Sequence, residues 1–518
     1  MKKNELLIIF LLLIFSIPSV LPLAHHGFFQ TDDGEWMIIR LSAFYQALHD
    51  GQFPVRFLQR LNSSYGYPVA EFLYPGSFYL GSLLHIVRFG FVNSIKIIFG
   101  LSLIGSAIFT YFWLKKFFSS LASLSGSMVA LYIPYHLYDI YKRGSVGEVF
   151  ALLWVPFIFW QIERKSFFYT SVGIALLIIS HNTLAALFFP LIICYMLLEI
   201  YISKNRRHAI YYYMYTLLIS LGLSAFFWLP VFFELHYTVF SSTTVSQWNN
   251  YFATIDQIGL VSFLVLIGVV VLFLIKKVEI KKHRLTVLLF VFSLLALFFS
   301  MNISSALWKV LPVSFIQFPF RFLSVIVVTI PFLAAFIISA FKEKQSWIAA
   351  IVLLLILGYS AFPFSRPTIY FDKGEGYYYT NDATTTVQDE YMPVWVKQKP
   401  LMSPQQKVFI TNGLGKTSII KQTNNSLAVE LSLKDNSTIQ VNTIYWPGWQ
   451  ATIDNKLSSI SYNNIQGVMV FHISKGNHIL KLTFGEDPIR FFADILTLVS
   501  LVCLFFISKR YSTKKNNK

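Results

Sequence analysis

The sequence predicts an α-helical protein that crosses a membrane about twelve times and carries a β-sandwich-like domain before its last crossing. Three observations favour this class. Only 13% of the 518 residues are charged and 55% are hydrophobic, whereas soluble domains carry about 25% charged residues. Apolar runs of about 20 residues, the length of a membrane crossing, recur along the chain. Short basic clusters separate many of these runs. This composition excludes an ordinary cytosolic enzyme, a disordered chain and a nucleic-acid-binding protein.

Twelve apolar segments are predicted to cross the membrane. The first, 6–23, lacks a small-residue cleavage site, so we expect an uncleaved anchor. The others are 93–114, 118–136, 147–162, 166–181, 184–202, 210–229, 257–275, 284–300, 323–341, 346–363 and 489–508. A thirteenth stretch, 70–89, is interrupted by Tyr74-Pro75-Gly76 and by Arg88. We interpret it as a helix that lies on, or dips into, the outer surface.

The basic clusters predict the orientation. If the N-terminus is cytoplasmic, twelve crossings leave every short cluster inside, as the positive-inside rule requires. These clusters are Lys115-Lys116, Arg164-Lys165, 204–207, 276–284, Lys342 with Lys344, and the C-terminal tail. A full crossing at 70–89 would put them all outside. We therefore expect both termini in the cytoplasm, and topology accounts for most of the net charge of +17.

The predicted transmembrane domain comprises residues 1–363. Its first outer loop, 24–92, contains two predicted surface helices, at 35–50 and 70–89. In the first helix, Met37, Leu41, Phe44 and Leu48 share one face opposite polar residues, which is typical of a helix lying in the membrane plane.

An extracytoplasmic β-rich domain is predicted over 364–488. Stretches such as 437–445 and 468–474 are rich in β-branched residues or alternate in polarity, and turn signals separate them. The chain then makes its last crossing at 489–508 and ends in a basic cytoplasmic tail, 509–518.

Ionisable residues at membrane depth are costly and are candidates for function. Nearly all of them fall on the predicted outer side. Asp32 and Asp33 follow the first crossing, and Glu35 is close by, so their charges repel one another. This segment is either a solvated acidic loop or the source of a general base or metal ligand.

Four further groups lie on the same side. Lys142 and Arg143 oppose the positive-inside trend and precede Glu148, which either steadies a helix end or completes a site for a lipid phosphate. His181 and Asn182 occupy a turn that either caps a helix or presents donors to a sugar or phosphate. Glu234 lies where an apolar helix is expected to unwind. Gln317 and Arg321 lie among aromatic residues, where Arg321 is either a snorkelling charge or a phosphate clamp. Acidic Asp389-Glu390 caps the site or forms a surface turn.

Several motifs resemble a family of bacterial membrane proteins. They are Thr31-Asp-Asp-Gly34, Gly51-Gln-Phe-Pro54, Tyr65-Gly-Tyr-Pro68, Arg143-Gly-Ser-Val-Gly-Glu148, Ser180-His-Asn182, Phe227-Trp-Leu-Pro-Val-Phe-Phe-Glu234, Gln317-Phe-Pro-Phe-Arg321 and Tyr445-Trp-Pro-Gly-Trp449. The family is that of the 6-pyruvoyl-tetrahydropterin-synthase-related membrane proteins, which are similar to YfhO-like proteins and to the GT-C glycosyltransferase superfamily. Pterin chemistry is not expected, because the chain has no His-x-His and its adjacent pair His25-His26 lies at a membrane exit.

The resemblance implies a GT-C-like fold with a catalytic Asp in the first outer loop, which corresponds to Asp33 or Asp32. It also implies a polyprenyl-phosphate-linked sugar as donor and places the protein in a bacterial plasma membrane. The expected reaction transfers the sugar, with inversion, to a cell-envelope glycan or polymer. One Asp would deprotonate the acceptor, and Lys142, Arg143 or Arg321 would hold the lipid phosphate. The sequence leaves open whether a divalent metal takes part.

A non-catalytic role is the competing hypothesis. A GT-C-like frame can also serve as a membrane scaffold, a lipid transporter or a partner in envelope assembly. Transporters usually contain inverted repeats with paired broken helices, and the sequence contains no evident repeat.

Overall fold

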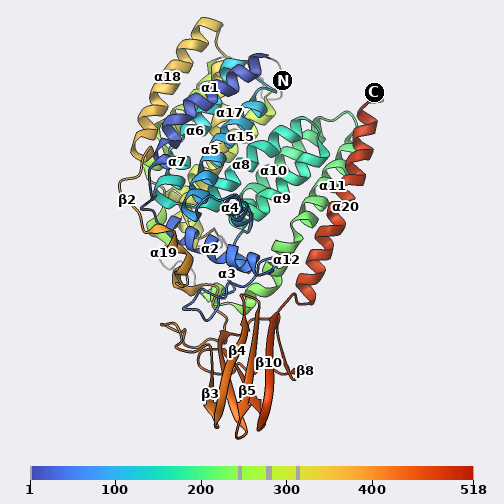
Figure 1. Cartoon of the computed structure of the whole chain (residues 1–518). Coiled ribbons are helices and arrows are strands. Elements are labelled where there is room, and N and C mark those ends of the chain that lie inside the picture. Colours follow the sequence, from blue (N-terminus) through green and yellow to red (C-terminus); the bar gives the residue numbers. More distant parts are fainter. Residues whose placement is uncertain (1–2, 243–247, 276–282, 311–315, 517–518) are drawn as a thin grey trace.

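The computed structural model describes residues 3–242, 248–275, 283–310 and 316–516. A body of packed helices carries a β domain at one end, and both chain termini lie at the other end of the helical body (Figure 1). An even number of crossings predicts that the two termini lie on the same side of the membrane. The structure agrees, because both termini lie at the end of the helical body opposite the β domain. Which end faces the cytoplasm stays a prediction.

All twelve predicted crossings contain helix. The main helices are α1 (Lys3–Val20), α5 (Phe91–Leu114), α6 (Ser120–Tyr132), α8 (Val146–Glu163), α9 (Phe167–Ser180), α10 (Asn182–Ile202), α11 (Arg206–Leu223), α12 (Ala225–Glu234), α14 (Leu260–Ile275), α15 (Arg284–Ser300), α17 (Leu323–Ser339), α18 (Glu343–Ala361) and α20 (Pro488–Asn516). Among the described residues, seven helices are long and apolar enough to cross a membrane, or nine if each bent pair counts as one span. The number twelve stays a prediction.

Short helical segments connect these helices. They are α7 (Pro134–Tyr138), the π-helical turn η2 (Asp139–Arg143), α13 (Ile255–Ile258), α16 (Ser305–Val310) and the 3-10 turn η9 (Pro319–Phe322). The turns η2 and η9 carry Arg143 and Arg321, respectively.

The predicted crossing 210–229 is not one straight helix. It breaks at Ser224, where α11 and the helix that follows are bent by 71°. The bend exposes backbone groups that need partners. The amide of Phe226 donates to the hydroxyl of Thr497 on α20 at 2.9 Å, and the Ser224 hydroxyl donates to the Ser220 carbonyl at 2.9 Å. A contact 271 residues away thus stabilises the bend.

The first outer loop contains α2 (Gly34–His49), α3 (Val69–Phe72) and α4 (Gly76–Ile86), and the predicted second helix is interrupted at 73–75. The polar face of α2 is covered in part, since Ser42 is buried whereas His49 is exposed. Arg40 and Ser42 on that helix are buried. The segment after α18 covers them, because the Ser42 hydroxyl donates to the Tyr378 carbonyl of α19 (Gly374–Thr380) at 2.6 Å.

The β domain consists of two antiparallel sheets. One has the order β4-β5-β10-β7-β8 and the other β3-β6-β9. The strands are β3 (Val408–Asn412), β4 (Gly415–Gln422), β5 (Ser426–Leu433), β6 (Ser437–Ile444), β7 (Trp449–Ile453), β8 (Lys456–Ser458), β9 (Val468–Ile473) and β10 (Gly476–Phe484). Side chains alternate between buried and exposed along β5, as in a sandwich. A separate pair, β1 (Phe28–Phe29) with β2 (Tyr370–Phe371), ties the segment before this domain to the first outer loop.

Arg490 joins the β domain to the helical body. Its guanidinium donates to both carboxylate oxygens of Glu234, at 2.9 and 2.5 Å, and to the Pro447 carbonyl at 2.9 Å. It also lies 3.3 Å from Glu71 of α3. Arg56 adds contacts to Glu71 and to Asp494 of α20. We name these five charged residues the Arg490 cluster; it connects α3, α12 and α20.

We expect Arg490→Met to destabilise the protein strongly. The substitution leaves the buried carboxylate of Glu234 without its arginine and leaves Glu71 with Arg56 alone. Breaking a buried ion pair costs about 3–5 kcal/mol. Thermal unfolding of the full chain in detergent measures the effect. The matched control is Arg366→Met, because Arg366 is exposed and such changes usually stay within about 0.5 kcal/mol. Equal melting of both variants would show that the Arg490 cluster does not hold the parts together.

Candidate functional site

The Thr31–Gly34 loop lies directly on the chain at 142–144. The amides of Asp32 and Asp33 donate to the carbonyls of Lys142 and Arg143 at 3.0 and 2.8 Å. Gly144 adopts a φ of +68°, and a Cβ there would lie 2.7 Å from the Gly34 nitrogen. Only glycine allows this approach. The two motifs that the sequence singled out separately therefore form one unit.

Asp33 occupies the first position before α2, and its carboxylate points to a cation. Its Oδ2 lies 3.6 Å from Nη2 of Arg143, and the Asp33 side chain remains 35% exposed. Asp32 is more exposed. The protein around Asp32 still removes part of the water from its carboxyl. This desolvation, followed by the charge of Asp33, raises the pKa of Asp32. Asp33 is thus held by an arginine, whereas Asp32 lies at the exposed edge of the site, which we call its rim.

A buried carboxylate binds two arginines. Glu148, in the first turn of α8, accepts hydrogen bonds from Nη1 of Arg143 at 2.6 Å and from Nε of Arg321 at 2.7 Å. All three side chains are at most 6% exposed. Phe318 and Phe320 cover the guanidinium groups, each 5.0 Å from one of them. We name Arg143, Glu148 and Arg321 the Glu148 cluster.

The charges around this cluster balance. Asp139 accepts a hydrogen bond from Nη1 of Arg143 at 2.9 Å. Burial, and next the charge of Glu148, raise the pKa of Asp139 well above its usual value, which favours the protonated carboxyl. With Asp139 protonated, the two arginines are matched by the carboxylates of Glu148 and Asp33. A balanced set avoids the high cost of an unpaired buried ion.

His181 and Gln317 complete the surroundings. The Leu184 amide donates to Nδ1 of His181 at 3.2 Å, which leaves the proton on Nε2, 3.9 Å from Glu148. Tyr74 stacks on the imidazole with ring centres 4.5 Å apart. The side-chain oxygen of Gln317 accepts a hydrogen bond from Nη1 of Arg321 at 2.9 Å.

The structure thus brings together six of the ten predicted site residues: Asp33, Arg143, Glu148, His181, Gln317 and Arg321. Asp32 and the half-buried Lys142 lie at the rim. Asn182 is exposed and its side chain caps the amide of Thr183. Glu234 is not among them, because it lies in the Arg490 cluster.

Sequence reasoning missed Arg40 and Tyr74 as neighbours of the site. Arg40 is 7% exposed and donates to Thr385 at 3.0 Å. A basic residue within the apolar part of a predicted surface helix was the available signal. Glu390 faces the same region, since the charges of Arg40, Arg321 and Asp33 act on it. Burial is the largest effect and raises the pKa of Glu390 to about 6.

Within the described ranges, no group of three or more His, Cys, Asp or Glu side chains is arranged to hold a metal ion. The carboxylates near the site are instead engaged by arginine.

These features belong to a polytopic membrane protein with a buried ion cluster beside an acidic loop. Residues 71–366 match the family described as 6-pyruvoyl-tetrahydropterin synthase related domain, membrane protein. The chain belongs to this family. The matched region contains the whole Glu148 cluster but neither Asp33 nor the β domain. No curated protein matches the sequence.

The chain is similar to solved structures of an oligosaccharyltransferase from Archaeoglobus fulgidus. One is AglB in complex with an inhibitory peptide and a dolichol-phosphate, at 12% identity over 72% of this chain and 57% of that chain, with a TM-score of 0.44. Another is the apo form, at 14% identity over 76% and 61%, with a TM-score of 0.47. This chain spans about three fifths of their length.

We expect Gly144→Ala to displace the Asp33 loop. An alanine there combines strain at positive φ with a Cβ 2.7 Å from the Gly34 nitrogen, at a combined cost of about 2–3 kcal/mol. Gly51→Ala is the matched control, since Gly51 has a φ of +89° but open space around it, and only about 1 kcal/mol is expected. Thermal unfolding of the two variants gives the comparison. Equal losses would mean that the close approach adds nothing.

The pH dependence of stability should reveal Glu390. Its pKa is raised from 4.5 to about 6, so the fold favours the protonated carboxyl. That stabilisation is present below pH 4.5 and is lost as the pH rises through about 6. We expect Glu390→Gln to remove this loss, as measured by melting midpoints from about pH 4 to about pH 7. The exposed Glu430→Gln is the control. An unchanged slope in Glu390→Gln would contradict the assignment.

Proposed function

We propose that this protein is a membrane glycosyltransferase that moves a sugar from a polyprenyl-phosphate donor to a cell-envelope acceptor at the outer face of the membrane. The observation that carries the proposal is Asp33, a carboxylate 35% exposed and 3.6 Å from Arg143 of the buried Glu148 cluster. A general base must reach its substrate, and a phosphate leaving group needs a fixed cation nearby. The accessible carboxylate of Asp33 beside the guanidinium of Arg143 supports the proposal on both counts.

The proposed reaction is a direct displacement. Asp33 takes the proton from the acceptor hydroxyl while the acceptor oxygen forms a bond to the anomeric carbon of the sugar. The bond from that carbon to the phosphate oxygen breaks, and the lipid phosphate leaves with the electron pair. One displacement inverts the anomeric centre. No general acid is needed, because phosphate is already a good leaving group.

Three cations are candidates to bind the phosphate. Lys142 is half-buried at the rim beside Asp32. Arg321 uses Nε and Nη1 for Glu148, Ile316 and Gln317, and its Nη2 has no hydrogen-bond partner in the part of the chain that the structure describes. Arg143 directs its Nη2 to Asp33. These donors support a phosphate position next to the base, with Glu148 holding both arginines in place.

One observation favours the alternative, a non-catalytic scaffold, lipid-transport or envelope-assembly protein. With Asp139 protonated, the charges of Arg143 and Arg321 are balanced by Glu148 and Asp33, so the Glu148 cluster needs no ligand to neutralise its charge. A purely structural role would need no more than this. Activity must therefore be tested at Asp33. Its carboxylate contributes to this charge balance, and yet its side chain remains accessible to a substrate.

We expect Asp33→Asn to reduce sugar incorporation into envelope polymer by about a hundredfold or more, because the amide cannot accept the acceptor's proton. The measurement compares cells that express equal amounts of folded wild-type or variant protein. Asp32→Asn is the matched control, since Asp32 lies one residue away at the rim, and we expect a much smaller loss. Unchanged incorporation in a well-expressed Asp33→Asn protein would refute this role, and the reverse ranking would assign the base to Asp32.

Two measurements separate the enzyme from the scaffold. Mass spectrometry of lipids from a deletion strain should detect an accumulated lipid-linked sugar if the protein consumes it. Purified protein should carry bound polyprenyl phosphate. Protein partners that co-purify without such lipid, and no accumulation in the deletion strain, would favour the scaffold.

A further inference from the structure

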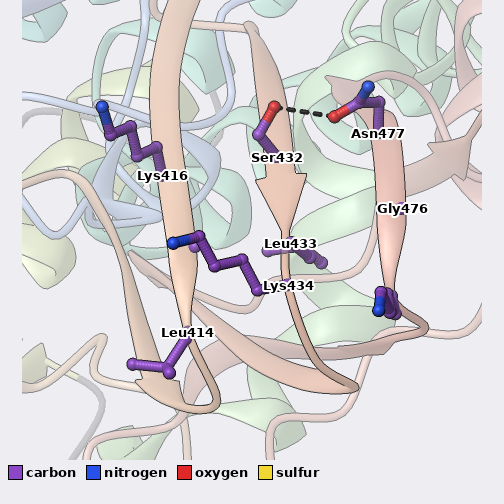
Figure 2. Close-up of a pocket in the computed structure, with 9 residues that line it drawn as sticks. Leu414, Lys416, Ser432, Leu433, Lys434, Gly476 and Asn477 are labelled. Carbon is purple, nitrogen blue, oxygen red and sulfur yellow. Dashed lines mark hydrogen bonds between the residues drawn. The ribbon is translucent and has the colours of Figure 1, made fainter.

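A pocket with three lysines lies at one end of the β domain. Its volume is about 440 Å³, and Leu414, Lys416, Leu433, Lys434, Lys475 and Asn477 are among its lining residues (Figure 2). We name it the distal basic pocket. None of the residues of the Glu148 cluster or the Arg490 cluster lines it, so it is separate from both.

Three chain segments build the pocket. Lys416 follows the start of β4, Lys434 follows β5, and Lys475 precedes β10. In the sheet, Gly415 of β4 and Gly476 of β10 both pair with Leu433 of β5. Both neighbours of Leu433 in the sheet are therefore glycines without a side chain. This leaves a hollow at the ends of the three strands. A Cβ at 415 would lie 2.5 Å from the Ser432 carbonyl oxygen, so the backbone approach requires glycine.

The pocket offers hydrogen-bond donors, and no carboxylate lines it. Lys416, Lys434 and Lys475 are exposed, and none forms an ion pair with an acidic side chain among the described residues. Neither Glu430 nor Asp435 lines the pocket. The Ser432 hydroxyl donates to the side-chain oxygen of Asn477 at 2.7 Å, which leaves the amide nitrogen of Asn477 available. Three ammonium groups and an amide are suited to the oxygens of an anion, and lysine is a common phosphate ligand.

The pocket lies far from the helical body. The other end of the same sheet contacts the first outer loop, where Phe484 lies 5.4 Å from Phe57 and the amide of Asn424 donates to Asp50 at 2.7 Å. The nine residues of β10 span roughly 30 Å at 3.4 Å each. Figure 1 shows these strand ends pointing away from the helices. Headgroups of the membrane that holds the helices therefore lie out of reach, and the ligand comes from the aqueous phase.

We propose that the distal basic pocket binds phosphate groups of a polyanionic chain in solution. Three lysines from three segments, spread around an open hollow, fit several linked phosphates better than one. This inference goes beyond the proposed transferase activity and does not depend on it, because the pocket contains no residue assigned to the reaction.

Calorimetric titration of the full chain in nanodiscs of neutral lipid tests the proposal, with inorganic tripolyphosphate as the probe. We expect the triple variant Lys416→Gln, Lys434→Gln, Lys475→Gln to lose about tenfold or more in affinity, since each lysine contributes charge-assisted hydrogen bonds. The control removes the same charge elsewhere on the sheet through Lys421→Gln, Lys456→Gln, Lys481→Gln, all exposed. About a twofold loss is expected there, as for general charge effects.

Three outcomes would overturn the proposal. Equal losses in the two triple variants would mean that only net charge matters. Equal affinity for orthophosphate and tripolyphosphate would mean that the pocket holds a single free phosphate. Capture of phosphatidylglycerol vesicles that tripolyphosphate cannot displace would mean that a second membrane is the partner. The Asp33→Asn protein should bind tripolyphosphate as the wild type does, so a failure of the transferase hypothesis is distinguishable from a failure here.

Discussion

The hydrogen bonds from Arg143 and Arg321 to the buried carboxylate of Glu148 are the interaction on which the half of the helical body next to the β domain depends. Glu148 is fully buried, and a lone ion there would be far less stable than in water. Two arginines from different turns, η2 and η9, must therefore meet at the start of α8. Because Arg143 also holds Asp33, the same requirement positions the acidic loop that precedes α2.

Much of the helical architecture follows from local patterns in the sequence. Apolar runs of the right length predict where helices form, and each of the twelve segments contains helix. The break at Ser224 was not predictable in this way, because its stabilising partner Thr497 is 271 residues away. Hydropathy averages over a window and cannot detect a bend that a distant hydroxyl makes possible.

The sequence indicates which charged residues lie at membrane depth, but not how they pair. Charge at membrane depth singles out Arg143, Glu148 and Arg321, but the pairing of Glu148 with Arg321 spans 173 residues. Glu234 has the same sequence signature, yet its partner is Arg490, 256 residues away. A one-dimensional pattern predicts the depth of a charge along a helix. It does not predict the position around the bundle, and this position decides which partner a charge meets.

The two ion clusters are connected through a short stretch of the first outer loop. Glu71 lies in the Arg490 cluster, and three residues later Tyr74 stacks on His181 beside Glu148. The ring of Tyr74 has little room to move, since a Cβ at Gly147 would lie 2.0 Å from it. The Arg490 cluster also holds α20 and the Pro447 carbonyl of the β domain. The position of the β domain and that of the ring over His181 are therefore fixed by one continuous set of contacts.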